Sequence, residues 1–286
     1  MKILQFLPLF ALLTFVACGD DDDNSTAATP GAFEVQFDNV FGDGADQRDL
    51  TLNAVGDTDY PYTNDMGQAF NLTFLRYFIS DVTLHNADGS DHKIPMSVSA
   101  EGAEGYFLVK EESSASQIIK FEDIPAGSYD AMSFTVGVDS SGVLEGAAGG
   151  ILDPVVNKMF WSWNAGYVAT KVEGQAPMAA GNAFGNTIDT SVANGFVYHI
   201  GGWKERAGTP LAYNNRRVRL EFFDNAKVTE EATPHVHLEF DVKQVLGADQ
   251  DVDFSGNNNV HSPADSKALG LADNMAAAFR FDHLHQ

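Results

Sequence analysis

The sequence has a single cysteine, Cys18, among 286 residues. A lone cysteine cannot form an intramolecular disulfide, so the thiol needs another explanation. Basic residues are also scarce: 17 lysines and arginines stand against 40 acidic residues, and the formal net charge is −23. Because nucleic-acid binding depends on neutralising phosphates with lysine and arginine, this charge predicts no nucleic-acid partner. It suits a soluble exported domain that attracts cations.

Long helical patterns and catalytic motifs are missing as well. The sequence contains no nucleophile elbow, no Walker loop and no HExxH zinc motif. Paired carboxylates abound, but in so acidic a chain they have no diagnostic value. We therefore expect a protein that is not an enzyme. The rival hypothesis, a metal-dependent hydrolase or redox enzyme, needs an open metal position beside an acid or base, and no motif indicates one.

The first 17 residues have the layout of a lipoprotein signal peptide. Met1-Lys2 gives a short positive start, and residues 3–16 are almost entirely apolar but too few for a permanent membrane-spanning helix. Phe15-Val16-Ala17-Cys18 resembles a lipobox. We predict cleavage after Ala17 and acylation of Cys18, which would anchor the protein in the outer membrane, at the cell surface or facing the periplasm. The alternative is an ordinary cleaved signal peptide followed by a stray thiol.

Residues 18–31 form an acidic, flexible tether in this interpretation. The four consecutive carboxylates of Asp20–Asp23 repel one another and cannot pack into a core. An acidic run directly after a lipidated cysteine resembles the surface-export signal of some bacterial lipoproteins. A plain acidic linker in a periplasm-facing lipoprotein is the alternative.

Short strands separated by turns dominate residues 32–286, which we expect to form a single domain. Phe33, Val35 and Phe37 alternate with polar residues, a pattern that indicates a half-buried strand. Residues 72–84 are apolar on both faces and predict a central strand. Further strands are predicted at 106–109, 118–121, 129–138, 196–200, 217–223 and 235–242. Together they predict a mostly β protein, a β-sandwich with Greek-key connections.

Two short inserted helices are expected. Asp153-Pro154 supplies an N-cap and a proline at the first helical position, and we predict that this helix continues through residues 159–163. The second begins at Ser262-Pro263. Its apolar stripe at helical spacing consists of Ala268, Leu271, Met275 and Phe279.

Several segments occur in the same order as in one known family. They are residues 75–84 (LRYFISDVTL), the motifs P-x-G-x-Y and F-x-x-G-V within 124–139, MFWSWNAGY at 159–167, YHIG at 198–201, and HSPAD with ADNM between 261 and 275. Together these segments, from about residue 33 to 280, resemble the MbnP-like family. The MFWSWNAGY segment is the most specific of them.

This resemblance implies copper as the bound cofactor and a role in copper acquisition or handling. Members of the family include methanotroph copper-binding proteins in which a tryptophan is oxidised to kynurenine and binds the metal beside histidines. A partner di-haem protein of the cytochrome c peroxidase type performs the oxidation. The resemblance thus implies that Trp161 or Trp163 is the modified residue. One position departs from the pattern, because copper-binding members have a histidine where this chain has Ser80.

His199 and His261 are candidate metal ligands. His199 lies near the end of a predicted strand and matches the His-x-Gly segment of the family, and Gly201-Gly202 would allow backbone or a metal to approach closely. His261 precedes the last predicted helix. A polar loop residue is the alternative interpretation of His261.

His235 and His237 are the alternative pair. Side chains alternate along a strand, so the two imidazoles share one face with Glu239 and Asp241 and could chelate copper or zinc. The other interpretation is the solvated outer face of a half-buried strand, because the sequence indicates no third ligand.

The remaining histidines and the tryptophans have plainer explanations. His283 and His285 are expected in a frayed C-terminal tail, and His85 and His92 beside a surface turn. Trp161 and Trp163 are ordinarily core residues. If the histidines do not converge, the chain would instead be a β-sandwich that docks a partner or an outer-membrane transporter without metal.

Overall fold

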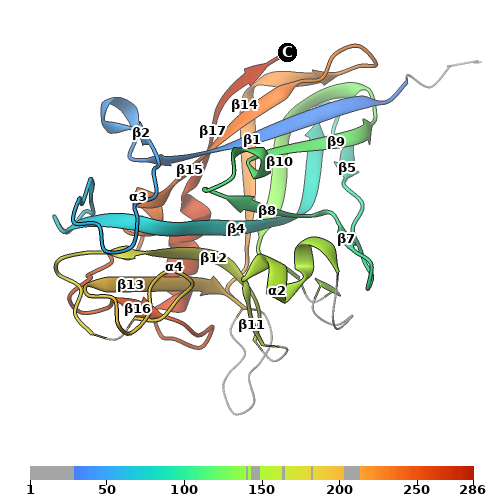
Figure 1. Ribbon diagram of the computed structural model, residues 1–286. Helices are drawn as coiled ribbons and strands as arrows, with labels where there is room; N and C mark the ends of the chain where they lie inside the picture. The colour runs from blue at the N-terminus through green and yellow to red at the C-terminus, as the bar shows by residue number, and fades with distance from the viewer. Residues whose placement is uncertain (1–28, 140, 143–148, 163–164, 182, 203–212) are drawn as a thin grey trace, which may run out of the picture.

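The computed structural model describes residues 29–139, 141–142, 149–162, 165–181, 183–202 and 213–286. The expectations for residues 1–28, including acylation of Cys18, and for Trp163 lie outside these residues. Strands dominate the described chain and form two main sheets packed face to face (Figure 1). The predicted mostly β sandwich is confirmed. None of the described helices has the length and apolar character needed to cross a membrane.

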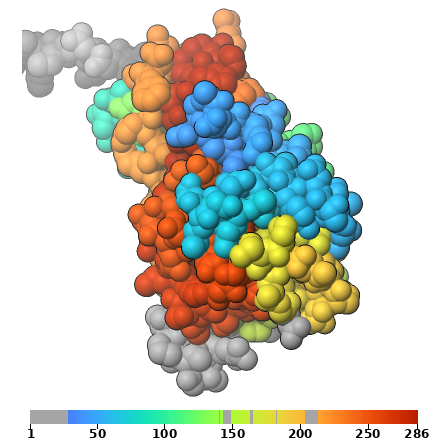
Figure 2. All heavy atoms as spheres, turned by 90° about the vertical axis from the view of Figure 1, so that its left-hand side faces the viewer, coloured from blue at the N-terminus to red at the C-terminus, as the bar shows by residue number. Residues whose placement is uncertain are grey.

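The smaller sheet brings the two ends of the domain together. Its strand order is β17-β15-β1-β2, and β9 also pairs with β1, on the side away from β15. β1 and β15 run parallel, with Val35 opposite Val236. Figure 2 shows the C-terminal residues, in red, beside the N-terminal segment, in blue, at one end of the molecule. The bounds are β1 Gly31–Phe41, β2 Arg48–Asp49, β9 Ile118–Ile124, β15 His235–Asp241 and β17 Phe279–His285.

The larger sheet has the strand order β14-β10-β4-β12-β13-β16. The predicted central strand is the middle of β4. Along one side, β4 pairs first with β12, through residues 71–77, and then with β10, through residues 79–86; β8 and β5 pair with it along the other side. The bounds are β4 Ala69–Asn86, β10 Gly127–Val136, β12 Gly166–Gln175, β13 Gly195–Gly201, β14 Arg216–Val228 and β16 Asn259–Val260. The shorter strands are β3 Tyr62–Thr63, β5 Asp91–Lys93 and β8 Tyr106–Lys110, which pair with β4, and β11 Phe160–Ser162, which pairs with β12. A separate pair is formed by β6 Ser97–Val98 and β7 Ala103–Glu104.

The first predicted helix begins as expected but ends early. The Asp153 carboxylate accepts the N–H of Val155 at 2.8 Å, and Pro154 opens α2 (Pro154–Asn157). The helix ends because Lys158 adopts a left-handed conformation with φ 57°. The chain then turns into strand β11, so the prediction of a helix through residues 159–163 was wrong.

The last helix begins later than predicted. Residues 262–267 form turns closed by the Asp265 N–H to Ser262 O and the Ala268 N–H to Asp265 O bonds, and α4 spans Ala268–Ala277. Its buried face includes Ala268, Leu271 and Met275, as predicted. Phe279 is also buried but opens strand β17 instead of continuing the helix. A further short helix, α3 (Val242–Val245), follows β15 directly.

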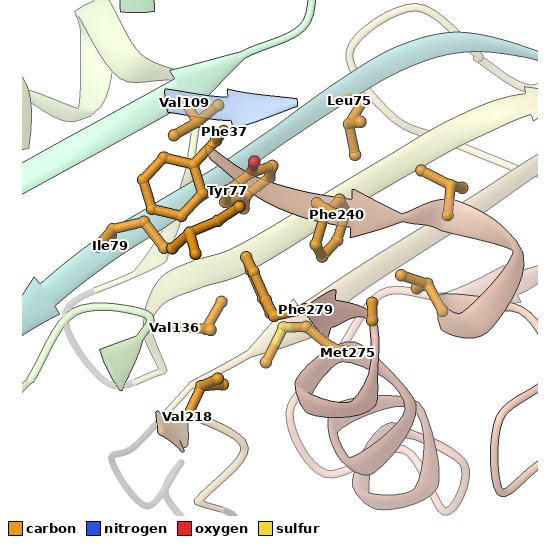
Figure 3. Close-up of a cluster of buried hydrophobic side chains, with 14 of the residues drawn as sticks. Phe37, Leu75, Tyr77, Ile79, Val109, Val136, Val218, Phe240, Met275 and Phe279 are labelled. Atoms are coloured by element: carbon orange, nitrogen blue, oxygen red, sulfur yellow. The ribbon is translucent and has the colours of Figure 1, made fainter. Parts of the chain in front are cut away.

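Aromatic side chains from both sheets form the core between them. Phe37 of β1 lies 5.8 Å from Phe134 of β10, and Tyr77 of β4 lies 4.5 Å from Phe240 of β15, measured between ring centroids. Figure 3 shows Phe37, Tyr77 and Phe240 pointing toward one another, with Phe279 beside them. This packing fixes which face of β15 points inward and therefore which face presents its histidines to solvent.

Candidate metal centre

His199 occupies a buried position on β13, the last long strand before the short edge strand β16 of the larger sheet. Its side chain is 2% exposed, and Lys171 of β12 lies opposite it in the strand register. Nε2 lies 2.8 Å from Oε1 of Glu173, another buried residue of β12. Nδ1 is buried and has no hydrogen-bond partner among the described residues. A carboxylate that holds one ring nitrogen and leaves the other bare is the usual support of a metal-binding histidine.

Four donors converge on the Glu173 carboxylate. Besides His199, these are the N–H groups of Asn186 and Thr187 at 2.7 Å and the Thr187 hydroxyl at 2.9 Å. Burial raises the pKa of Glu173, but the hydrogen bonds, led by the one from His199, outweigh it and hold the pKa at about 2. Burial lowers the pKa of His199 to about 4. At neutral pH the pair is an ionised carboxylate and a neutral imidazole, the protonation state that a metal ligand needs.

His261 packs against His199, and Trp161 lines a cavity together with His261. The ring centroids of His199 and His261 are 4.5 Å apart. His261 lines a cavity of about 230 Å³ together with Trp161, Ser162, Ala165, Ser262 and Pro263. The Trp161 indole is part-buried on strand β11, and its Nε1 has no hydrogen-bond partner among the described residues. The structure therefore brings together His199, His261 and Trp161, which are distant in sequence.

A close backbone approach holds the His261 loop against β13. Gly202 has φ +90°, and a Cβ placed there would lie 2.5 Å from Cβ of Pro263. The Asn214 side-chain amide donates to Gly201 O at 2.9 Å and to Pro263 O at 3.0 Å. The predicted close approach behind His199 thus involves the chain that follows His261.

Ser80, the position at which the family histidine is missing, lies outside this centre. Its hydroxyl is fully buried and donates to Gly137 O at 2.8 Å. Arg76, four residues earlier on β4, aligns through Lys171 of β12 with His199 of β13. Ser80 is therefore about 13 Å further along the sheet and two strands, or about 10 Å, across it. Its identity does not affect the His199–His261 pair.

His235 and His237 lie on the outer face of the smaller sheet, and β17 supplies two partners that the sequence did not indicate. His237 pairs with His283 and His235 with His285 in the β15–β17 register. One ligand nitrogen from each of His237, His283 and His285 lies within 4.8 Å of the others. The predicted frayed tail was therefore wrong.

A bulge explains why the C-terminal strand escaped detection. Between the His237–His283 and Leu238–Phe281 pairs, β17 contains one extra residue, Asp282. Strict alternation from buried Phe279 would have placed His283 on the inner face, whereas the bulge restores it to the outer face opposite His237. The repeated His-x-His pattern in both strands was the available signal.

The two carboxylates predicted beside these histidines form ion pairs instead. Glu239 and Asp241 share the histidine face of β15, but both pair with Arg280, the latter at 3.2 Å.

His85 also has partners for both ring nitrogens. Its Nδ1 lies 2.6 Å from Asp91 Oδ1, and its Nε2 lies 2.8 Å from Ser133 Oγ. Neither ring nitrogen of His85 is therefore open to a metal.

The sequence matches the MbnP family over residues 30–262. The chain belongs to the MbnP family. Among solved structures, MbnP from Methylosinus trichosporium is similar with a TM-score of 0.50 and 16% identity, over 87% of this chain and 96% of that chain. At this identity the likeness shows the fold alone. No curated protein matches the sequence.

Proposed function

We propose that this MbnP-family member binds copper through His199 and His261, beside Trp161. The observation that supports this most strongly is the buried Nδ1 of His199, which lacks a partner among the described residues while Glu173 holds the opposite ring nitrogen. An unsatisfied buried polar atom costs about 1 to 3 kcal/mol. A metal held between the two imidazoles would offset that cost.

The enclosure of this centre favours Cu⁺ over Cu²⁺. Imidazole nitrogens suit copper in either state. Burying a charge costs more as the charge grows, and the ionised Glu173 carboxylate that supports His199 is already opposed by the buried ammonium group of Lys171. Two neutral imidazoles and one cuprous ion therefore fit a site at the inner end of a small cavity.

Trp161 would complete the centre after oxidation to kynurenine. In an intact indole the nitrogen lone pair belongs to the aromatic ring and only the N–H is offered, whereas ring opening converts this nitrogen into an aniline nitrogen, whose lone pair is a weak ligand. Trp161 lines the same cavity as His261, and Trp163 lies outside the described residues, so Trp161 is the residue that we propose to be modified. We propose that a di-haem peroxidase-like partner catalyses this oxidation with peroxide as the oxidant, and that the lost ring carbon leaves as formate.

The cellular part of the proposal rests on the N-terminal sequence. A signal peptide at residues 1–17 and acylation of Cys18 would anchor the domain to the outer membrane, where it would acquire or handle copper. Replacing Cys18 with alanine should release the protein from the membrane fraction or leave it unprocessed. A Cys18→Ala protein that is processed and still fractionates with the membrane would contradict the anchor.

The metal site is tested with the double variant His199→Gln/His261→Gln. Glutamine at position 199 retains an amide donor for Glu173 while removing Nδ1. Competition with a Cu⁺ chelator should show at least a roughly 100-fold weaker affinity than wild type, because both imidazole ligands are lost. His92→Gln is the control, since its part-buried ring lies away from the centre on β5. Equal Cu⁺ affinity in all three proteins would refute the site, and no Cu⁺ binding by any of them would leave a docking protein without metal as the explanation.

The modification has its own test. Peptide mass spectrometry of protein from the native host should find Trp161 with the loss of one carbon and the gain of one oxygen. Protein made without the oxidase should retain intact indole. Intact Trp161 in native protein that is expressed together with the oxidase would contradict the maturation step.

A further inference from the structure

Four imidazoles gather on the solvent-facing side of β15 and β17, away from the buried centre. Ring centroids are 4.2 Å apart for His237 and His283, 4.8 Å for His283 and His285, and 4.5 Å for His235 and His237. All four side chains project from paired strands with a fixed register. The cluster is therefore a consequence of the sheet and not of a loop conformation.

The ring nitrogens of His283 and His285 have the spacing of two ligands on one metal. Their Nε2 atoms are 3.1 Å apart. Two nitrogens that each lie about 2.0 Å from a metal are about 2.9 Å apart at a right angle and about 3.3 Å apart at a tetrahedral angle. His237 contributes a nitrogen within 4.8 Å of both. Small rotations of the exposed rings would bring all three to bonding distance.

Carboxylates hold the opposite ring nitrogens. Nδ1 of His237 lies 2.7 Å from Oδ2 of Asp38 on β1, and Nδ1 of His283 lies 2.7 Å from Oδ2 of Asp282. Each carboxylate accepts the Nδ1–H and leaves Nε2 as the free lone pair. Carboxylate–histidine pairs of this kind orient metal ligands and raise their basicity.

His235 adds a fourth imidazole at the edge of the cluster. Its Nε2 is buried and lacks a hydrogen-bond partner among the described residues, while Nδ1 lies 3.3 Å from Oε1 of Glu34. Two strands of histidines and a neighbouring strand of carboxylates thus form one continuous surface. A merely solvated strand face would not need three separate histidine–carboxylate pairs.

We propose that His237, His283 and His285, with His235 alongside, form a second metal site that captures Cu²⁺ from solution. An all-imidazole ligand set suits copper, nickel and zinc, and among divalent first-row ions Cu²⁺ binds such sites most tightly. The net charge of −23 attracts divalent cations to the protein. This site shares no residue with the buried centre, and β17, which supplies two of its histidines, lies beyond the region that matches the family.

The test uses the full-length chain purified without a histidine tag. Cu²⁺ is titrated calorimetrically, and the complex is examined by electron paramagnetic resonance for coupling to imidazole nitrogens. His283→Gln/His285→Gln should weaken Cu²⁺ binding about 100-fold or more and reduce the nitrogen coupling. The matched control, His85→Gln/His92→Gln, removes the same number of histidines from β4 and β5 and should bind like wild type.

Several outcomes would overturn the site. These are a wild-type chain that shows no nitrogen-coordinated Cu²⁺, or a His283→Gln/His285→Gln variant that binds Cu²⁺ like the control. Melting curves without metal check folding, and His237→Gln provides a second variant in the middle of the sheet. The Cu⁺ assay of His199→Gln/His261→Gln is separate, so either site can fail while the other stands.

Discussion

The two histidine groups use the same carboxylate support in opposite surroundings. At the buried centre, Glu173 is fully enclosed and receives four donors, and His199 is 2% exposed. On the outer face, Asp38 and His237 are 30% and 13% exposed, and His283 is 47% exposed. Losing a histidine–carboxylate hydrogen bond therefore costs more stability at the buried site, where no water can replace the missing partner, than on the exposed face.

This difference indicates different tasks for the two sites. The enclosed site has a fixed geometry and a lower tolerance for added charge, which supports the proposal of a singly charged ion there. The exposed site is open to solvent, which supports the proposal of an exchangeable, doubly charged ion. The same carboxylate-to-amide replacement in each site therefore separates structural cost from effects on metal binding.

Glu173→Gln should have the largest effect. An amide presents one acceptor oxygen and turns its NH₂ toward donors that now lack a partner. We expect a loss of about 3 kcal/mol in the free energy of unfolding, measured by urea titration. Glu112→Gln, which alters an exposed pair with Arg76, is the control and should cost less than about 1 kcal/mol. Equal costs at the two positions would show that the buried network is not structural.

Gly202→Ala should come next. A side chain at φ +90° is strained, and its Cβ would collide with Pro263 next to His261. We expect a loss of about 2 kcal/mol together with weaker Cu⁺ binding, because the His261 loop must move. Gly102→Ala is the matched control, since nothing lies within 4 Å of a Cβ at that position. Unchanged Cu⁺ affinity in Gly202→Ala would mean that the loop does not position the ligand.

Glu111 provides a pH reference outside both sites. Burial raises the pKa of Glu111 to about 7 from its usual 4.5, although Asn39 Nδ2 donates to its Oε2 at 2.8 Å. The folded state therefore favours the protonated form, and this contribution to stability is complete below pH 4.5 and lost as the pH rises through 7. After discounting for solvent screening, Glu111→Gln should gain about 1 to 2 kcal/mol at pH 8 and nothing at pH 4. A gain that does not depend on pH would contradict this assignment.

Asp38→Asn should have the smallest effect on stability, less than about 1 kcal/mol, because the carboxylate is part-exposed. Its effect on Cu²⁺ should nevertheless be about 10- to 100-fold, because Asp38 orients His237. Calorimetric titration of Cu²⁺ and thermal melting of the same sample separate the two effects. A large loss of stability with unchanged Cu²⁺ affinity would show that Asp38 stabilises the fold and does not orient a metal ligand, contrary to the comparison above.

Much of the fold follows from local patterns, and the exceptions have physical causes. The alternation in residues 33–37 correctly predicts which face is buried, because one residue in two must enter the core. In residues 235–242 it correctly places Val236, Leu238 and Phe240 in the core, but Glu239 and Asp241 on the other face are buried as well. The Asp153-Pro154 signal marks where a helix begins but not where it ends, and Lys158, a non-glycine residue with positive φ, ends it after one turn. The C-terminal strand was missed because the bulge at Asp282 breaks the period of two.

The sites were less predictable than the strands. The contact between His199 and His261 joins residues 62 positions apart, and only the family resemblance suggested it. Glu173 was missed because one glutamate among 40 acidic residues has no distinguishing sequence signal. Its role depends on burial and on four converging donors, which are properties of the folded chain.

The parallel pairing of β1 with β15 also determines the order in which the protein is completed. Val35 must wait for Val236, about 200 residues later, before that ladder can form. At a synthesis rate of about 5 to 20 residues per second, the first strand remains without this partner for about 10 to 40 seconds. Long-range closure of this kind slows folding. A chain threaded across a membrane from its N-terminus would therefore complete its fold only after nearly all of it had crossed.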